Sequence, residues 1–185
     1  MSSLATEIGW IESRREEMLR FWSLVENGTI PMRVSHNDTK LSNILFDKNG
    51  NVLCVIDLDT MMSSTSLNDF GDAIRSYTNT GAEDDKDLNR VSMSMEIFRA
   101  YTEGYLSERK NSMTESELEW LAFSAKYITY EQVLRFLMDY IDGDTYYRIH
   151  YPEHNLVRTH AQFKLLQSME EQFEQMKRTV KEIVR

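Results

Sequence analysis

Apolar residues recur at helical spacing in the first part of the chain. Within residues 4–26 they fall three or four positions apart, or at multiples of a turn, at Ile8, Ile11, Leu19, Trp22 and Val25. This spacing predicts one amphipathic helix over residues 4–26. Gly28 and Pro31 follow, and both residue types are typical of the end of a helix.

The pattern then changes to two short β-type runs, ILF at 44–46 and VLCVI at 52–56. Between them lies Asn49-Gly50, a dipeptide typical of hairpin turns. A lone hairpin is marginally stable in water, so we expect this one to pack on helices. Cys54 lies within the second run, and we expect it to be a small buried residue.

The rest of the chain has mostly helical periodicity. Helices are expected over 67–77 and 88–107, then from a capping box at Thr114–Glu117 as far as Ile141, and finally over 156–184, after a loop. The fold class is therefore α+β, mostly α. We expect a single domain over 1–185, made of the helix 4–26, a loop and hairpin at 34–60 and a helical remainder at 66–185.

Composition narrows the classes of function. The 185 residues are 41% hydrophobic and 28% charged, as in soluble globular proteins, and the net charge is −9. This charge disfavours nucleic acid as a partner, because phosphate binding needs clustered Lys and Arg. No apolar run approaches the roughly 18 residues of a membrane span. With a single cysteine, the sequence predicts a soluble cytoplasmic protein that binds no membrane.

Polar residues gather around the predicted hairpin. The turn pairs positions whose numbers sum to about 99 or 100, which puts Asn43 opposite Ile56 or Asp57. A carboxylate and an amide oxygen held side by side suit Mg²⁺. Asp38, five residues before Asn43, can then act on a substrate hydroxyl.

The order H-x-D-x-x-x-x-N, followed by Asp after a hairpin, is the catalytic arrangement of protein-kinase-like enzymes. In that arrangement Asp38 accepts or orients the proton of the attacking hydroxyl. Asn43 and Asp57 hold the Mg²⁺ that bridges the ATP phosphates, and His36 orients the loop. His36 is also expected to be a hydrogen-bonded structural histidine.

The segments HNDTKLSNILFD, CVIDLDT and NDFGDAIR resemble the aminoglycoside phosphotransferase and choline kinase family. With LRFLMDYIDGDTYYRIHYPEHNLVRTHAQFKLL, the chain is most similar to N-acetylhexosamine 1-kinases, which phosphorylate the anomeric hydroxyl of GlcNAc or GalNAc. The resemblance implies a protein-kinase-like C-terminal lobe, ATP as co-substrate and Mg²⁺ as cofactor. It implies Asp38 as the base and Asn43 and Asp57 as the metal ligands.

The same resemblance suggests contacts to the sugar. Arg135 and Tyr146 are candidates for them. Asp72 is a further candidate, although an ion pair with Arg75 near the site is the stronger expectation. Asp59 is either a second contact to the metal or a residue that contacts the metal ligands without binding the metal itself.

The family's N-terminal lobe supplies a phosphate-covering loop, a lysine and a glutamate. No Gly-rich loop and no V-A-I-K-like strand precedes His36. We therefore expect the C-terminal lobe alone, with weak activity or none by itself. We also expect exposed apolar surface where the other lobe would lie, which favours a homodimer through that face.

Other functions remain open at this point. The acceptor could be an aminoglycoside or choline, or the chain could be a non-catalytic kinase-like binding module. Asp57 and Asp59 also fit the D-x-D of haloacid-dehalogenase-type phosphatases, although that fold alternates further strands with helices. A D-x-D glycosyltransferase would need a nucleotide-binding α/β half before Asp57.

Overall fold

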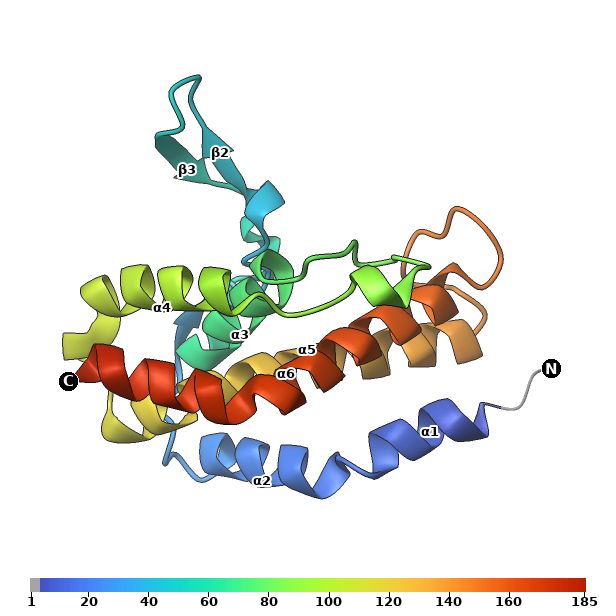
Figure 1. Ribbon diagram of the computed structural model, residues 1–185, viewed down its shortest axis with the longest axis horizontal. Coiled ribbons are helices and arrows are strands. Elements are labelled where there is room, and N and C mark those ends of the chain that lie inside the picture. Colours follow the sequence, from blue (N-terminus) through green and yellow to red (C-terminus); the bar gives the residue numbers. More distant parts are fainter. Residues whose placement is uncertain (1–3) are drawn as a thin grey trace.

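The computed structural model describes residues 4–185. Four long helices form the body: α3 (Ser66–Tyr77), α4 (Met95–Arg109), α5 (Glu115–Ile141) and α6 (His154–Val184). α5 and α6 pack side by side, α3 packs on α5, and α4 packs on α6 (Figure 1). The predicted class, α+β and mostly helical, is confirmed.

Large apolar side chains from all four helices of the body, and from α2 (Arg15–Glu26) beside them, fill the core. The fully buried members include Phe21, Phe70, Phe98, Leu121, Leu165 and Leu166. α3 and α5 lie close together at Gly71, where an added Cβ would lie 2.5 Å from the carbonyl oxygen of Ser124. Gly71 therefore sets the distance between these two helices.

The predicted capping box at the start of α5 is confirmed. The Thr114 side chain accepts from the Glu117 N–H, and the Glu117 carboxylate accepts from the Thr114 N–H. The same carboxylate, fully buried, also binds Arg33 at 2.6 Å and Ser66 at 2.8 Å. Burial opposes the charge of Glu117, but these partners outweigh it and lower its pKa to about 2.

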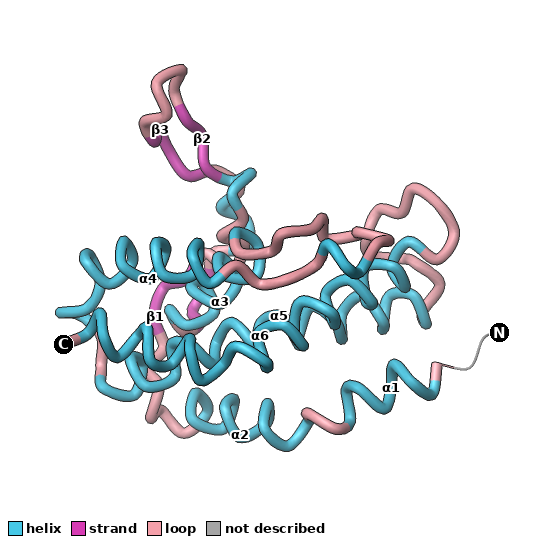
Figure 2. Tube along the Cα trace, viewed as in Figure 1, coloured by secondary structure: helices cyan, strands magenta, loops and turns pink. Residues whose placement is uncertain are grey.

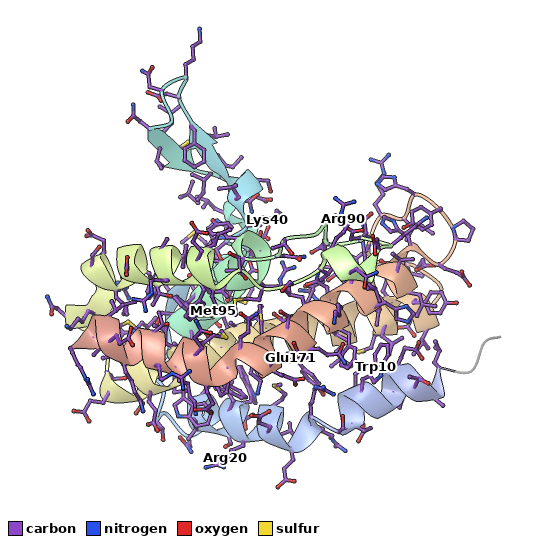
Figure 3. The ribbon with its side chains drawn as sticks, viewed as in Figure 1. Trp10, Arg20, Lys40, Arg90, Met95 and Glu171 are labelled. Atoms are coloured by element: carbon purple, nitrogen blue, oxygen red, sulfur yellow. The ribbon has the colours of Figure 1, made fainter. Side chains whose placement is uncertain are left out.

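The single helix predicted over residues 4–26 is wrong in detail, because the structure contains two helices, α1 (Ala5–Glu12) and α2 (Arg15–Glu26). At the break, Arg14 turns toward α6 and forms a bidentate pair with Glu170 at 2.6 and 2.7 Å. Trp10 stacks on Phe163 of α6. Figure 3 shows Trp10 on the side of α1 that faces the helices of the body. The break lets both halves follow the surface of the body.

The predicted hairpin is confirmed, and a second sheet was missed. β2 (Ile44–Phe46) pairs with β3 (Val52–Val55) in one antiparallel sheet. β1 (Arg33–Ser35) pairs with β4 (Met62–Ser64) in another, so the two strands enclose the whole loop and hairpin (Figure 2). These three-residue strands are too short to show a clear alternation in the sequence.

The hairpin does not pack on helices, which corrects the prediction. It projects from the body, and every residue of β3 is exposed (Figure 1). Cys54 is exposed as well, so its predicted burial is wrong. The hairpin is held together by the backbone pairing of β2 with β3. Within residues 4–185, nothing covers most of its apolar side chains.

Other boundaries differ less. The helix predicted from Leu88 begins at Met95, where Ser94 caps it, and Leu88–Arg90 forms a short 3₁₀ turn. The last helix begins at His154, after the expected loop. None of the helices within residues 4–185 combines the length and the apolar character that a transmembrane span requires.

Candidate active site

A loop between β1 and the 3₁₀ turn Leu41–Asn43 carries the residues predicted for catalysis. α3 holds this loop through two carboxylates one turn apart. Asp69 accepts from the backbone N–H groups of His36 and Asn37, at 3.0 and 2.7 Å. Asp72 accepts from the backbone N–H of Thr39 at 2.7 Å. The loop therefore has a fixed shape, because its amides are bound to a rigid helix.

Asp38 lies between two donors at the centre of the loop. Its Oδ2 accepts from Lys40 Nζ and from Asn43 Nδ2, each at 2.8 Å. Burial raises the pKa of Asp38, but the Lys40 and Asn43 hydrogen bonds and the Lys40 charge outweigh it and hold the pKa below its usual value. Asp38 is therefore ionised at neutral pH, in the state that can accept a proton.

Lys40 itself lies where the hairpin leaves the helical body (Figure 3). Its hydrogen bond to Asp38 raises the pKa of the ammonium, burial lowers it, and the charges of Asp38, Asp57 and Asp72 raise it. Lys40 is thus a fixed positive charge among three carboxylates. Lys40 was not predicted as a site residue, although its place two residues after Asp38 was a usable signal.

The hairpin register places Asn43 and Asp57 near each other, as the turn predicted. Ile44 pairs with Val55, and the Ile56 N–H donates to the Asn43 carbonyl at 2.9 Å. Asp57 follows directly and has a left-handed backbone with φ of 62°. Such a conformation is strained in a residue other than glycine, and it changes the direction of the chain just after the strand.

His36 connects the loop to this end of the hairpin. Its Nε2 lies 3.2 Å from the carbonyl oxygen of Ile56. A carbonyl can only accept, so Nε2 carries the proton. Nδ1 is buried without a hydrogen-bond partner in residues 4–185. The geometry is that of a positioning histidine, which fixes the residue before Asp57 relative to the loop that carries Asp38.

The oxygens expected to bind metal are available. Across the described part of the chain, no hydrogen bond or ion pair engages Asn43 Oδ1 or the exposed carboxylates of Asp57 and Asp59. No group of three or more His, Cys, Asp or Glu residues there could hold a metal ion. One amide and one carboxylate still fit Mg²⁺, which takes one or two carboxylates and completes its shell with water and substrate phosphates.

A cavity of about 400 Å³ opens beside Asp38. Arg135 of α5 and Tyr146 of the following loop line it, and Asp72 and Arg75 of α3 line another part. The structure thus brings the residues predicted for sugar binding to the cavity that also contains the predicted base. Asp59 is not among the lining residues, and its role stays a prediction.

Asp72 and Arg75 form the expected ion pair. The Arg75 guanidinium donates to Asp72 Oδ1 at 2.8 and 3.1 Å, and both residues are buried. Glu83 and Gln162 bind the other end of Arg75, at 2.8 and 3.3 Å. The Asp72 carboxylate therefore has protein partners on both oxygens.

Sequence reasoning missed Asp69 and Glu131. Asp69 lies three positions before Asp72, so both carboxylates lie on one face of a helix, which was a signal for a shared partner. Glu131 gives no local signal, because it lies 93 positions after Asp38 on α5 and reaches the cavity only through tertiary packing.

Residues 3–108 match the family described as the phosphotransferase enzyme family, which is more than half of the chain. This protein belongs to that family. The matched segment includes the loop of Asp38, the hairpin and α3. Both sheets of the described residues are antiparallel, which disagrees with the parallel sheet of a dehalogenase-type phosphatase.

Family membership assigns the general chemistry. The family consists of phosphotransferases, enzymes of the kinase type, which in general use ATP and Mg²⁺. The helical lobe with a protruding hairpin, and the loop between them, are the kinase-like fold expected from the sequence.

Proposed function

We propose that the protein transfers the γ-phosphoryl group of ATP to a hydroxyl of a small molecule, and that the acceptor is an N-acetylhexosamine, phosphorylated at its anomeric hydroxyl. One observation carries the transfer step: the Asp38 carboxylate, whose pKa the Lys40 and Asn43 hydrogen bonds hold below its usual value, lines a cavity large enough for a monosaccharide. The choice of sugar rests on the resemblance of the sequence to N-acetylhexosamine 1-kinases. Another small alcohol is the alternative acceptor.

In this proposal Asp38 takes the proton of the acceptor hydroxyl. The hydroxyl oxygen forms a bond to the γ-phosphorus, the bond from that phosphorus to the bridging oxygen of ADP breaks, and ADP leaves. Phosphoryl transfer depends mainly on positioning and charge stabilisation, so the fixed shape of the loop matters as much as the base.

Asn43 and Asp57 are the proposed holders of Mg²⁺, with Asp59 close by in the sequence. Their free oxygens support this assignment. Bound there, Mg²⁺ would neutralise charge on the ATP phosphates. The Lys40 ammonium is hydrogen-bonded to Asp38, and the charge of Asp57 also raises its pKa. Lys40 is therefore close enough to the proposed metal ligand Asp57 to interact with the ATP phosphates as well.

The first test is ADP release with Mg-ATP and a panel of GlcNAc, GalNAc, galactose, choline and kanamycin. Asp38→Asn should lower the rate about 10²- to 10⁴-fold, as expected for removal of a general base. Asp142→Asn, an exposed carboxylate at the end of α5, is the matched control and should leave the rate unchanged.

Two outcomes would contradict the proposal. Equal rates for the wild type and Asp38→Asn would remove Asp38 as the base. Mg²⁺-dependent binding of a fluorescent ATP analogue, without ADP release for any acceptor, would instead favour a non-catalytic kinase-like module.

A further inference from the structure

Most charged groups around the cavity already have protein partners. Asp38 is bound by Lys40, and Asp72 is bound by Arg75, each pair at 2.8 Å. Glu131 also lines the cavity, half-buried, yet no hydrogen bond or ion pair to its carboxylate exists within residues 4–185. Among the acids of the described cavity wall, Glu131 is the one whose carboxylate has no protein partner on either oxygen.

Burial is the main influence on Glu131 and raises the pKa of its carboxyl group, which Arg135 lowers in part and Asp72 raises further. Glu131 is half-buried rather than buried, so its carboxylate keeps contact with water while no protein group donates to it. A ligand that donates hydrogen bonds to Glu131 would meet no competing protein donor. The position is therefore suited to recognition rather than to stability.

Arg135, one turn further along α5, provides the complementary group. Its guanidinium lies over the rings of Tyr146 and Tyr147, at 5.8 and 5.5 Å from their centres. Within the described chain it forms no hydrogen bond or ion pair of its own. The α5 wall thus presents one acceptor and one donor without protein hydrogen-bond partners, Glu131 and Arg135, four positions apart.

The charge balance of the wall points to a class of acceptor. With the Asp38 and Asp72 pairs internally neutralised, the free groups amount to one anion and one cation. A polycationic acceptor would need an excess of carboxylates. A quaternary ammonium would need several aromatic rings, whereas Tyr146 is the one aromatic side chain among the described lining residues. Hydroxyl groups, which both donate and accept, match this wall.

We infer that Glu131 is a specificity-determining residue, whose carboxylate accepts hydrogen bonds from hydroxyl groups of a neutral, polyhydroxylated acceptor while Arg135 donates to a neighbouring oxygen. The inference rests on the proposed function, since it places the acceptor of that reaction in the same cavity. A site that hydrogen-bonds a hydroxyl discriminates strongly against an analogue that lacks it.

The test is calorimetric binding of the same acceptor panel to the wild type, Glu131→Gln and Glu119→Gln. Glu119 is an exposed residue of the same helix and provides the matched control. We expect a neutral sugar to bind the wild type and Glu119→Gln equally, and to bind Glu131→Gln at least ten-fold more weakly. A deoxy analogue that lacks the recognised hydroxyl should bind the wild type and Glu131→Gln alike.

Thermal unfolding separates recognition from a structural role. Because Glu131 has no protein partner, Glu131→Gln should not lower the melting temperature. The inference is overturned if Glu131→Gln binds the sugar as the wild type does, if only choline or kanamycin binds, or if no member of the panel binds. Loss of folding in Glu131→Gln would also overturn it.

Asp38→Asn distinguishes this inference from the proposed reaction. It should lose turnover and still bind the acceptor, with the dependence on Glu131 retained. If Asp38→Asn keeps full turnover, the assigned base is wrong, while the binding data for Glu131 retain their meaning.

Discussion

Asp38 shows how a few atoms set the state of a reactive group. Two donors at 2.8 Å, from Lys40 and Asn43, lower its pKa against the opposing influence of burial. The spacing of the sequence was enough to select Asp38, Asn43 and Asp57, because they lie within one local loop and hairpin. It could not select Glu131, whose place at the cavity depends on how α5 packs.

The role of Lys40 can be tested by titration. In Lys40→Met, the hydrogen bond and the charge that favour the carboxylate are removed while burial persists, so the pKa of Asp38 should rise. Protonated Asp38 cannot accept a proton, so any activity should fall at a higher pH than in the wild type as the solution is acidified. Carbon-13 NMR of the Asp38 carboxyl group measures the pKa directly, without turnover.

Lys48→Met is the control for this titration, because Lys48 is exposed in the hairpin turn. It should leave the Asp38 titration unchanged. An Asp38 pKa that stays the same in Lys40→Met would assign its depression to the remaining influences, the Asn43 hydrogen bond and the charge of His36.

At the scale of elements, α3 connects the hydrophobic core to the loop that carries Asp38. One face packs on α5 at Gly71, and Asp69 and Asp72 hold the catalytic loop. The sequence predicted this helix and the hairpin register, since both depend on local patterns. It did not predict the break at Arg14 or the pairing of β1 with β4, since both depend on contacts between distant segments.

Gly71→Ala should disturb the packing of α3 on α5 and, with it, the loop that Asp69 and Asp72 hold. The new methyl group would lie 2.5 Å from the Ser124 carbonyl oxygen, which forces the helices apart. We expect a loss of about 1–3 kcal/mol in the free energy of unfolding, the usual range for overpacking. Chemical denaturation measures it.

Gly104→Ala is the matched control, because an added Cβ at this α4 position meets nothing within 4 Å. It should be neutral or slightly stabilising, since alanine favours helices over glycine. Equal stabilities of the two variants would show that α3 and α5 can separate without cost.

At the scale of the whole molecule, the hairpin is an arm with uncovered apolar side chains on both faces. Phe46, Leu53 and Val55 are 45%, 63% and 50% exposed. An isolated two-stranded hairpin also has unpaired edges, and apolar surface of this kind favours association. The family resemblance predicted exposed apolar surface only where the other lobe would lie, and the hydrophobic pattern of the hairpin predicted that its side chains are buried.

We predict that the chain self-associates through the hairpin. Sedimentation velocity should show a concentration-dependent dimer for the wild type and a monomer for the double variant Phe46→Lys, Val55→Glu. Ile97→Lys, which changes an exposed apolar residue of α4, should leave the dimer intact. A wild type that stays monomeric at every concentration would contradict the prediction.

The wall of the cavity that α5 provides has a consequence for how such a protein can change. Ile128, Glu131, Gln132 and Arg135 lie on one face of a single helix, while the groups proposed to handle ATP come from the hairpin and its loop. Substitutions confined to these four positions could therefore change which alcohol the cavity accepts without altering the residues proposed to bind ATP and Mg²⁺. In this architecture the substrate range can diverge while the type of reaction is preserved, because different segments of the chain determine each.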